Sequence, residues 1–252
     1  MSDANEGAVA LLLAARGAPE RRLAALPEAL RPADAGAAYA IQHRVAVSLG
    51  PIGGWKVGAA GPTAQPSCSP MPASGVTPSP ATLSSASRPM RGIEAEVAFR
   101  LGRDLPPRGT PYSREEVIAA LAAAHPAIEL LESRYRDPDA VDALGNLADG
   151  QMHSGFVWGE GVADWHGIDF THETVEQTVD AGEPLRRTGN PAGDMIRLVV
   201  WLANEGSVWA GGLKAGQFVT CGSWTGKTLV GPAATARVRF PSLGEVRVRY
   251  TV

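Results

Sequence analysis

The 252-residue chain has few cysteines and no long hydrophobic run. Cys68 and Cys221 do not have the spacing of a zinc site or a redox pair, and two cysteines make no disulfide framework, so we expect free thiols. The apolar stretch 8–15 is too short to cross a bilayer, and acidic residues precede it where an export signal would be basic. These absences predict a soluble, cytoplasmic protein that does not associate with membranes.

An excess of basic charge is also missing. The 23 lysines and arginines are fewer than the 26 aspartates and glutamates, which gives a net charge of -3. Nucleic-acid binding requires a basic stripe, and the arginines here are scattered along the chain. The sequence also has neither the alternation of strands and helices nor the glycine fingerprint of a dinucleotide-binding fold. We therefore expect no nucleic-acid partner.

Acidic residues are absent from one long stretch. No Asp or Glu lies between Lys56 and Glu94, and residues 59–92 are instead rich in Pro, Ser, Thr and Ala. This composition favours irregular backbone, so we expect a long loop over 59–92. Long loops in compact domains are usually either functional lids or disordered segments.

The remaining composition is that of an ordinary globular protein, with 44% hydrophobic residues. A chain of this length buries roughly 70–75% of its unfolded surface, which supplies a sizeable core. The first fifty residues predict two helical pieces separated by the proline-containing stretch 27–32, with Asp34 capping the second piece. We expect these helices to cover the rest of the protein.

Beyond residue 50 most patterns are those of strands. Apolar and polar residues alternate over 93–101, which predicts a strand with one buried face. Other strands are expected at 54–58, 127–131, 156–158, 218–221, 236–240 and 245–252. One helix is expected from the capping box of Ser113 and Glu116 to about residue 125, and another over 190–206. The chain is therefore expected to adopt a mainly β, mixed α+β fold.

Two carboxylates on the strand at 93–101 are candidates for a metal site. Glu94 and Glu96 are two residues apart, so in a strand they point to the same face with Cα atoms about 6.5–7 Å apart. Carboxylate oxygens are the ligands that Mg²⁺ prefers. The alternative is a solvated strand face that carries two unrelated glutamates.

Glu129 is the natural third ligand. It lies between two aliphatic residues of an expected strand, where an unpaired buried carboxylate would be costly. Either a cation compensates it, or this face is open to water, or Glu132 and Arg134 form the relevant pair instead. Lys56 lies in the glycine-flanked strand at 54–58, where it is either an acid–base group, a fixed charge for a carboxylate substrate, or an ordinary solvated lysine.

Short segments spaced along the chain carry a resemblance to a known family. They are 38–42 (AYAIQ), 54–58 (GWKVG), 93–99 (IEAEVAF), 127–130 (AIEL), 147–149 (LAD), 189–191 (GNP), 201–204 (WLAN), 213–216 (LKAG) and 221–225 (CGSWT). In this order, over residues 35–250, they resemble the fumarylacetoacetate hydrolase superfamily. Within it they resemble the branch of 2-keto-4-pentenoate hydratases and 4-oxalocrotonate decarboxylases.

The resemblance implies a set of site residues. Three carboxylates would bind Mg²⁺ or Mn²⁺, and one lysine would transfer a proton or anchor the substrate. Three further residues would lie near the substrate, one of them at an acidic loop position. The metal ligands are Glu94, Glu96 and Glu129, the lysine is Lys56, and the substrate-binding residues are Asp149, Gly222 and Ser223.

The resemblance also implies an architecture and an activity. The fold would be the mixed β-sandwich roll of this superfamily over residues 51–252, beside a helical region over 1–50, and relatives form homo-oligomers. The activity would be a divalent-metal-dependent hydratase, a lyase that adds water to 2-hydroxypenta-2,4-dienoate-like 2-oxo acids through a metal-stabilised enolate. Such enzymes serve the catabolism of aromatic compounds. A decarboxylase of the 4-oxalocrotonate type is the alternative, because it needs the same metal and lysine.

Other possibilities stay open because the chain departs from the family pattern. The stretch 57–92 has no acidic residues, and after Asp149 the chain continues to His153 where many relatives have an Asp-Asn pair. These two departures leave the proton relay undefined. His153 is either a substitute acid or base, or a structural residue. An acylpyruvate-type C–C hydrolase is less favoured, because His43 has no obvious glutamate partner. The last alternative is a non-catalytic 2-oxo acid binder or an accessory partner of a neighbouring enzyme in the pathway.

Overall fold

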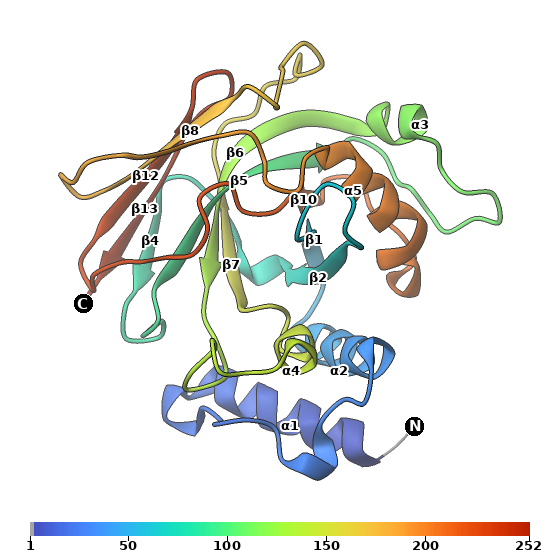
Figure 1. The fold of residues 1–252 in the computed structure, drawn as a ribbon, viewed down its shortest axis with the longest axis vertical. Coiled ribbons are helices and arrows are strands. Elements are labelled where there is room, and N and C mark those ends of the chain that lie inside the picture. The colour runs from blue at the N-terminus through green and yellow to red at the C-terminus, as the bar shows by residue number, and fades with distance from the viewer. Residues whose placement is uncertain (1–2) are drawn as a thin grey trace.

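The computed structural model describes residues 3–252, and helices cover one end of a β-rich body (Figure 1). The N-terminal helices are α1 (Asp3–Gly17) and α2 (Ala35–Ser48), joined by two short 3₁₀ turns. Asp34 caps α2, since its carboxylate accepts a hydrogen bond of 2.8 Å from the backbone N–H of Ala37. The two helical pieces and this cap are confirmed. None of the helices in the described part of the chain is long and apolar enough to span a membrane.

The larger sheet contains the strands on which the candidate residues lie. Its strand order is β2-β1-β10-β5-β6-β7-β3, and β11 pairs with β5 outside this path. The strand β1 lies between an antiparallel neighbour, β2, and a parallel one, β10. The bounds are β1 (Ile52–Gly58), β2 (Ser67–Pro72), β3 (Val76–Pro78), β5 (Gly92–Leu101), β6 (Leu121–Leu131), β7 (His153–Trp158), β10 (Phe218–Thr220) and β11 (Thr228–Leu229).

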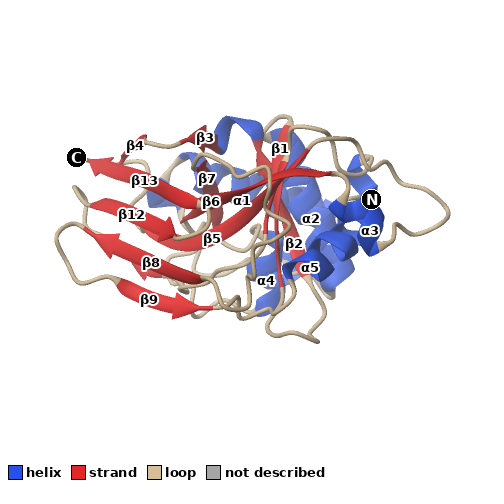
Figure 2. Ribbon diagram, turned by 90° about the horizontal axis from the view of Figure 1, so that it is seen from above, coloured by secondary structure: helices blue, strands red, loops and turns tan. Residues whose placement is uncertain are grey.

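The smaller sheet packs on one face of the larger one, as Figure 2 shows from above. Its order is β4-β13-β12-β8-β9, with β4 (Ala81–Ser84), β8 (Thr174–Val179), β9 (Leu185–Thr188), β12 (Thr235–Phe240) and β13 (Gly244–Thr251). Alternate residues of β5 and β6, such as Val97 and Ile128, meet Val238 and Val246 in the main core. The mainly β, mixed α+β fold class is confirmed.

A second, smaller core holds the helices to the sheets. Residues Leu12 of α1 and Ile41 of α2 pack with Tyr135 and Ala148, which belong to the segment after β6. Helix α4 (Ala143–Ala148) lies in this segment and packs against α2. The helical cover therefore includes residues from the middle of the chain, and the division into 1–50 and 51–252 stays a prediction.

The expectation of a long loop over 59–92 is wrong. Three strands, β2, β3 and β4, lie in this stretch. Each is at the edge of its sheet, where a proline that donates no hydrogen bond is tolerated. Pro70 and Pro72 occupy β2, which pairs with β1 on one side only. The prediction from composition was therefore wrong because prolines also occur in edge strands.

Other boundaries also differ from the sequence prediction. Helix α3 (Arg114–Ile118) starts at the predicted capping box but is only one turn long, and His125 and Pro126 lie inside β6 rather than ending a helix. Helix α5 (Met195–Trp201) begins after Asp194, whose carboxylate caps it, and not at Asn190. The strands β8 and β9 were not predicted, because nothing in 174–188 alternates strongly enough to indicate them.

Candidate metal centre and substrate pocket

Three carboxylates converge on one point of the larger sheet. Glu94 and Glu96 lie on the same face of β5, and Glu129 lies directly opposite Glu94 on the antiparallel strand β6. One oxygen from each of the three carboxylates lies within 4.8 Å of the others. The predicted third ligand is therefore brought to the predicted pair by the strand register.

The face that carries these residues is buried. Glu96 and Glu129 are 1% and 0% exposed, and Glu94 is partly exposed at the mouth of a pocket. The hydroxyl of Thr220 on β10 donates a hydrogen bond to Oε2 of Glu96. The solvated strand face that the spacing alone left open is thus wrong, because β5 is covered on both faces.

Lys56 on β1 completes the charged cluster. Its ammonium Nζ lies 2.8 Å from Oε1 of Glu129 and donates a 3.1 Å hydrogen bond to the backbone carbonyl of Gln151. Burial by itself lowers the pKa of Lys56, but the attraction of Glu129, Glu94 and Glu96 outweighs it and raises that pKa above its usual value. The structure therefore holds this lysine as an ammonium group and not as a free base.

His153, at the start of β7, contacts the same carboxylate oxygen as Lys56. Its Nδ1 lies 2.9 Å from Oε1 of Glu129, and because an ionised carboxylate only accepts, the proton belongs on Nδ1. Burial lowers the pKa of His153, which favours the neutral ring. The sequence favoured a structural role for this histidine over an acid–base role, and its position shows that it orients Glu129.

The carboxylates repel one another strongly. Burial, and then the charge of Glu129, raise the pKa of Glu94 to about 7 and raise the pKa of Glu96 well above its usual range. Burial also raises the pKa of Glu129, but Lys56 and His153 together lower it below the usual value. Two of the three carboxylates therefore have no sufficient compensating charge among the described residues.

These residues fit a hard divalent cation. The Oε2 atom of Glu129 is buried and has no hydrogen-bond partner among the described residues. A buried acceptor without a partner is costly unless something absent from the chain satisfies it. Three carboxylate oxygens on one side, with an open pocket on the other, are the donor set that Mg²⁺ or Mn²⁺ prefers, and they offer no soft ligand.

The pocket beside the carboxylates has a volume of about 450 Å³. Lys56, Glu94 and Glu96 form its charged wall, and amides and hydroxyls of residues that were not predicted form much of the remainder. These unpredicted polar residues are Gln65, Ser67, Gln151 and Asn190. The cavity is large enough for a small organic acid.

Gly222 and Ser223 also line this pocket, as the sequence suggested they should. Gly222 has φ = 77°, a left-handed conformation that favours glycine, so the turn after β10 requires it. The side chain of Asn190 fastens this turn by donating to the carbonyl of Cys221 at 2.9 Å. Their role in binding a substrate stays a prediction.

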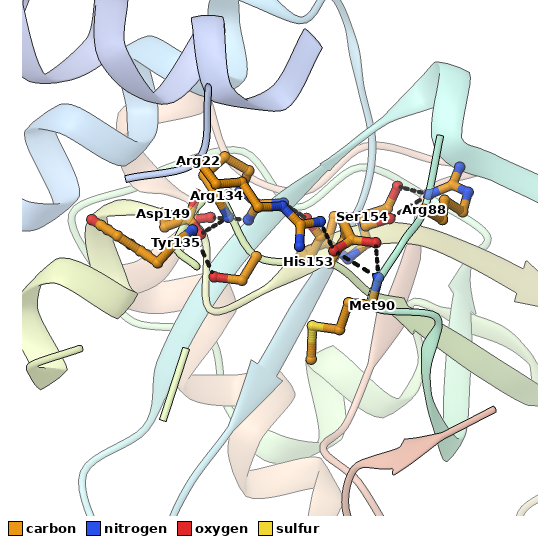
Figure 3. Close-up of polar contacts among 10 residues, drawn as sticks. Arg22, Arg88, Met90, Arg134, Tyr135, Asp149, His153 and Ser154 are labelled. Atoms are coloured by element: carbon orange, nitrogen blue, oxygen red, sulfur yellow. Dashed lines mark hydrogen bonds and ion pairs between the residues drawn. The ribbon is translucent and has the colours of Figure 1, made fainter. Parts of the chain in front are cut away.

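Asp149 does not reach the pocket. It ends α4, is 3% exposed, and its carboxylate accepts hydrogen bonds from the side chain and the backbone N–H of Arg134, as Figure 3 shows. Arg134 also donates to the carbonyls of Asp149 and His153 at 2.6 and 3.1 Å. The carboxylate is thus occupied by a buried ion pair, and this position gives no support to the prediction of substrate binding. The suggested pair of Glu132 with Arg134 is also not formed, since Glu132 pairs with Arg22.

Removing Asp149 should therefore affect stability rather than substrate affinity. We expect Asp149→Ala to lower the free energy of unfolding by about 3–5 kcal/mol, because it leaves the guanidinium of Arg134 buried without its partner. Urea denaturation measures this change, and the exposed Asp164, replaced in the same way, is the control. A rise in KM without any loss of stability would instead favour substrate binding.

Gln151 is a site residue that the sequence did not indicate. Gly150, Gln151 and Met152 all have positive φ values of 74°, 55° and 63°, an uncommon conformation for side-chain-bearing residues. This turn aims the Gln151 carbonyl at Lys56, while the Gln151 amide donates to Ser67 at 2.8 Å. Only Gly150 signalled the turn in the sequence.

Curated proteins of two related activities match the chain. A 2-keto-4-pentenoate hydratase of Paraburkholderia phymatum is 32% identical over 161 residues, which cover 63% of this chain and 60% of that protein. A 4-oxalocrotonate decarboxylase of a Pseudomonas species is 28% identical over 162 residues, which cover 61% and 58%. The matched region thus spans about three fifths of the length of these relatives. No protein-family model matches the chain.

Solved structures show the same fold. The chain superposes on "4-oxalocrotonate decarboxylase from Pseudomonas putida G7 - complexed with magnesium and adipate" with a TM-score of 0.80 and 23% identity, over 98% of each chain. A putative fumarylacetoacetate hydrolase family protein from Yersinia pestis CO92 gives a TM-score of 0.57 and 15% identity, over 80% of this chain and 93% of that one. The expected β-sandwich roll with an N-terminal helical region is confirmed.

Proposed function

We propose that this chain, which belongs to the fumarylacetoacetate hydrolase superfamily in the branch of 2-keto-4-pentenoate hydratases and 4-oxalocrotonate decarboxylases, is a divalent-metal-dependent hydratase of small 2-oxo acids. The observation that carries the proposal is the convergence of Glu94, Glu96 and Glu129 with Lys56 at one open pocket. This set combines a cation site with a proton donor. The proposed substrate resembles 2-hydroxypenta-2,4-dienoate.

The three carboxylates would hold Mg²⁺ or Mn²⁺, with the remaining coordination positions open to the pocket. When bound, the ion would supply Lewis-acid stabilisation of negative charge on the oxygens of the 2-oxo acid. The ring of His153 holds Glu129 in place from behind. The chain itself thus orients the ligands, and only the cation is supplied from outside.

Lys56 is the group that handles protons in this proposal. Held as an ammonium by the neighbouring carboxylates, it is suited to donate a proton to a carbon of the dienoate or a hydrogen bond to its carboxylate. The hydroxyl of Ser223 and the backbone of Gly222 line the same pocket, and in this proposal they contact the carboxylate end of the substrate. The amides of Gln65 and Gln151 also line the pocket, and in this proposal they orient the attacking water.

The charge of the pocket favours a hydratase over a decarboxylase. Among the described residues that line it, Lys56 is the one with a positive side chain. A 2-oxo acid with one carboxylate needs no more than the metal and this lysine. A 4-oxalocrotonate-type substrate has a second carboxylate, for which the described lining offers neutral groups such as the amides of Gln65 and Asn190 but no second cationic side chain. Such a substrate would lack the charge-assisted contact that usually binds a carboxylate.

The test is a pair of assays on the same metal-loaded protein. With 2-hydroxypenta-2,4-dienoate and Mg²⁺, we expect the ultraviolet absorbance of the diene to disappear. With 4-oxalocrotonate, we expect little release of carbon dioxide. Release of carbon dioxide as the faster reaction would establish the decarboxylase instead, and binding of oxalate without either reaction would establish a binding or accessory protein.

Assembly and location stay predictions from the sequence. We propose a homo-oligomer, as in the family, and light scattering on purified protein measures it. A complex with a neighbouring enzyme of the pathway would appear as co-elution of the two proteins. A cytoplasmic location is the proposal that the free, buried thiols of Cys68 and Cys221 support.

A further inference from the structure

A second polar cavity lies between the N-terminal region and the larger sheet, away from the carboxylate cluster. It has a volume of about 210 Å³, and no residue lines both this cavity and the metal pocket. Four arginines from distant parts of the chain line it, together with Glu132 and three serines. The arginines are Arg16, Arg22, Arg88 and Arg134.

The charges in this cavity do not balance. Arg22 pairs with Glu132, and Arg134 pairs with Asp149. Neither Arg16 nor Arg88 forms an ion pair within the described part of the chain. Within the described part of the chain, the guanidinium of Arg88 donates only to the hydroxyl and the carbonyl of Ser154, as Figure 3 shows. Two guanidinium groups in one cavity therefore have no ion-pair partner of their own among the described residues.

Arg16 is the less satisfied of the two. Its Nε is buried and has no hydrogen-bond partner among the described residues, and its Nη2 makes one long contact of 3.4 Å with the carbonyl of His153. Burial, followed by the charge of Arg134, lowers the pKa of Arg16 to about 9. An arginine in this state is costly unless an anion joins it.

The neutral groups in the wall are also suited to an anion. The hydroxyls of Ser133 and Ser154 each accept a hydrogen bond, from the N–H of Tyr135 and from Arg88, which leaves their own protons free to donate. Ser87 lies exposed at the rim, so the cavity is open to solvent. Glu132 already accepts hydrogen bonds from Arg22 and from the N–H of Met90, so its charge is compensated locally.

We infer that this cavity is a binding site for a phosphate-type dianion, held by the guanidinium groups of Arg16 and Arg88 and by the hydroxyls of Ser133 and Ser154. The two guanidinium groups that form no ion pair match the two negative charges of such an ion. The donors approach the cavity from four parts of the fold: α1, the segment before β5, the end of β6 and the start of β7. A tetrahedral oxyanion has acceptor oxygens pointing in several directions, so it can accept hydrogen bonds from all of them. The site is independent of the proposed activity.

The cavity contacts the metal centre indirectly. Arg16 and Arg134 both donate to the backbone carbonyl of His153, whose ring holds Glu129. The experiment must therefore separate the two places. Metal-free protein, kept in a chelator, gives phosphate no metal to bind in the carboxylate pocket.

The test is thermal unfolding and calorimetric titration of metal-free protein with inorganic phosphate. Sodium chloride at equal ionic strength is the control for general screening. We expect phosphate to raise the melting temperature, and Arg16→Gln and Arg88→Gln each to weaken phosphate binding by about tenfold or more, the effect of losing one charge-assisted contact. Arg21→Gln is the matched control, since Arg21 lies in the same segment as Arg22 but is exposed and does not line the cavity.

Each outcome decides the inference. A phosphate shift no larger than that of sodium chloride, or one that survives in both variants, overturns it, and circular dichroism checks that the variants are folded. Succinate as the only dianion that binds would also overturn it, because the site would then select carboxylates. If glycerol 3-phosphate binds more tightly than inorganic phosphate, the physiological ligand is a phosphate ester. If inorganic phosphate binds as tightly as glycerol 3-phosphate, the physiological ligand is the free phosphate ion.

Discussion

Replacing Lys56 by methionine is expected to lower turnover of the proposed dienoate substrate by at least about a hundredfold while Mg²⁺ binds as tightly as before or more tightly. A hundredfold is the lower end of what a positioned proton donor contributes. The ammonium lies 2.8 Å from Oε1 of Glu129, so its removal takes away a charge that opposes an incoming cation. Steady-state kinetics and calorimetric titration of Mg²⁺ measure the two effects separately.

The prediction is specific because turnover is expected to fall while Mg²⁺ affinity stays the same or rises. A lysine that only held the carboxylates together would lose metal binding and turnover in parallel. Lys214→Met is the matched control, because Lys214 is half exposed and its nearest carboxylate, that of Asp104, is 3.9 Å away. Turnover of Lys56→Met within a few-fold of the wild type would contradict a catalytic role. Weaker Mg²⁺ binding would instead assign Lys56 to the assembly of the site.

The strands that carry the site were largely predictable from the sequence, because their patterns are local. Alternation over 93–101 placed Glu94 and Glu96 on one face of β5, and the short apolar stretch around Glu129 indicated a second strand. What the sequence could not provide is the register. Glu129 lies opposite Glu94 only because β5 and β6 are paired with that offset, and no local pattern fixes the offset.

The burial of the carboxylate face was not predictable for a similar reason. A face with two glutamates and an arginine is typical of a solvated strand. Here β10 pairs with β5 in the same sheet and brings the hydroxyl of Thr220 beside Glu96. Because β10 lies more than a hundred residues further along the chain, only a long-range contact distinguishes this face from a solvated one.

The arginine cavity shows the limit of sequence reasoning more clearly. Arg16, Arg22, Arg88 and Arg134 are separated by up to 118 positions and looked scattered in the sequence. The exclusion of nucleic-acid binding rested on that scatter and on the net charge, and neither property reports a cluster that forms only on folding. In the same way, Asp149 carried a family motif, but its partner Arg134 was visible only in three dimensions.

Replacing Glu96 by glutamine is expected to stabilise the metal-free protein and to weaken Mg²⁺ binding at the same time. Glutamine keeps the shape and an acceptor for the hydroxyl of Thr220, so the main loss is one of three like charges in a buried cluster. An unsatisfied buried polar group costs roughly 1–3 kcal/mol and a charged one more, so we expect the substitution to raise the free energy of unfolding by at least about 1 kcal/mol. The gain is expected to grow as the pH rises above the ordinary pKa of a glutamate, because the raised pKa of Glu96 opposes its ionisation in the folded protein; urea denaturation in a chelator at several pH values measures it.

The loss of metal affinity follows from the same charge. Two unit charges 4 Å apart interact by about 4 kcal/mol at an effective dielectric constant of 20, and the ion carries two charges. We therefore expect Mg²⁺ affinity to fall by at least about a hundredfold, which is about 2.7 kcal/mol. Glu132→Gln is the contrasting control: this buried carboxylate is fully paired, so the change should destabilise the fold and leave Mg²⁺ affinity unchanged. If Glu96→Gln were instead less stable in chelator and bound Mg²⁺ like the wild type, the three carboxylates would be a structural network rather than a metal centre.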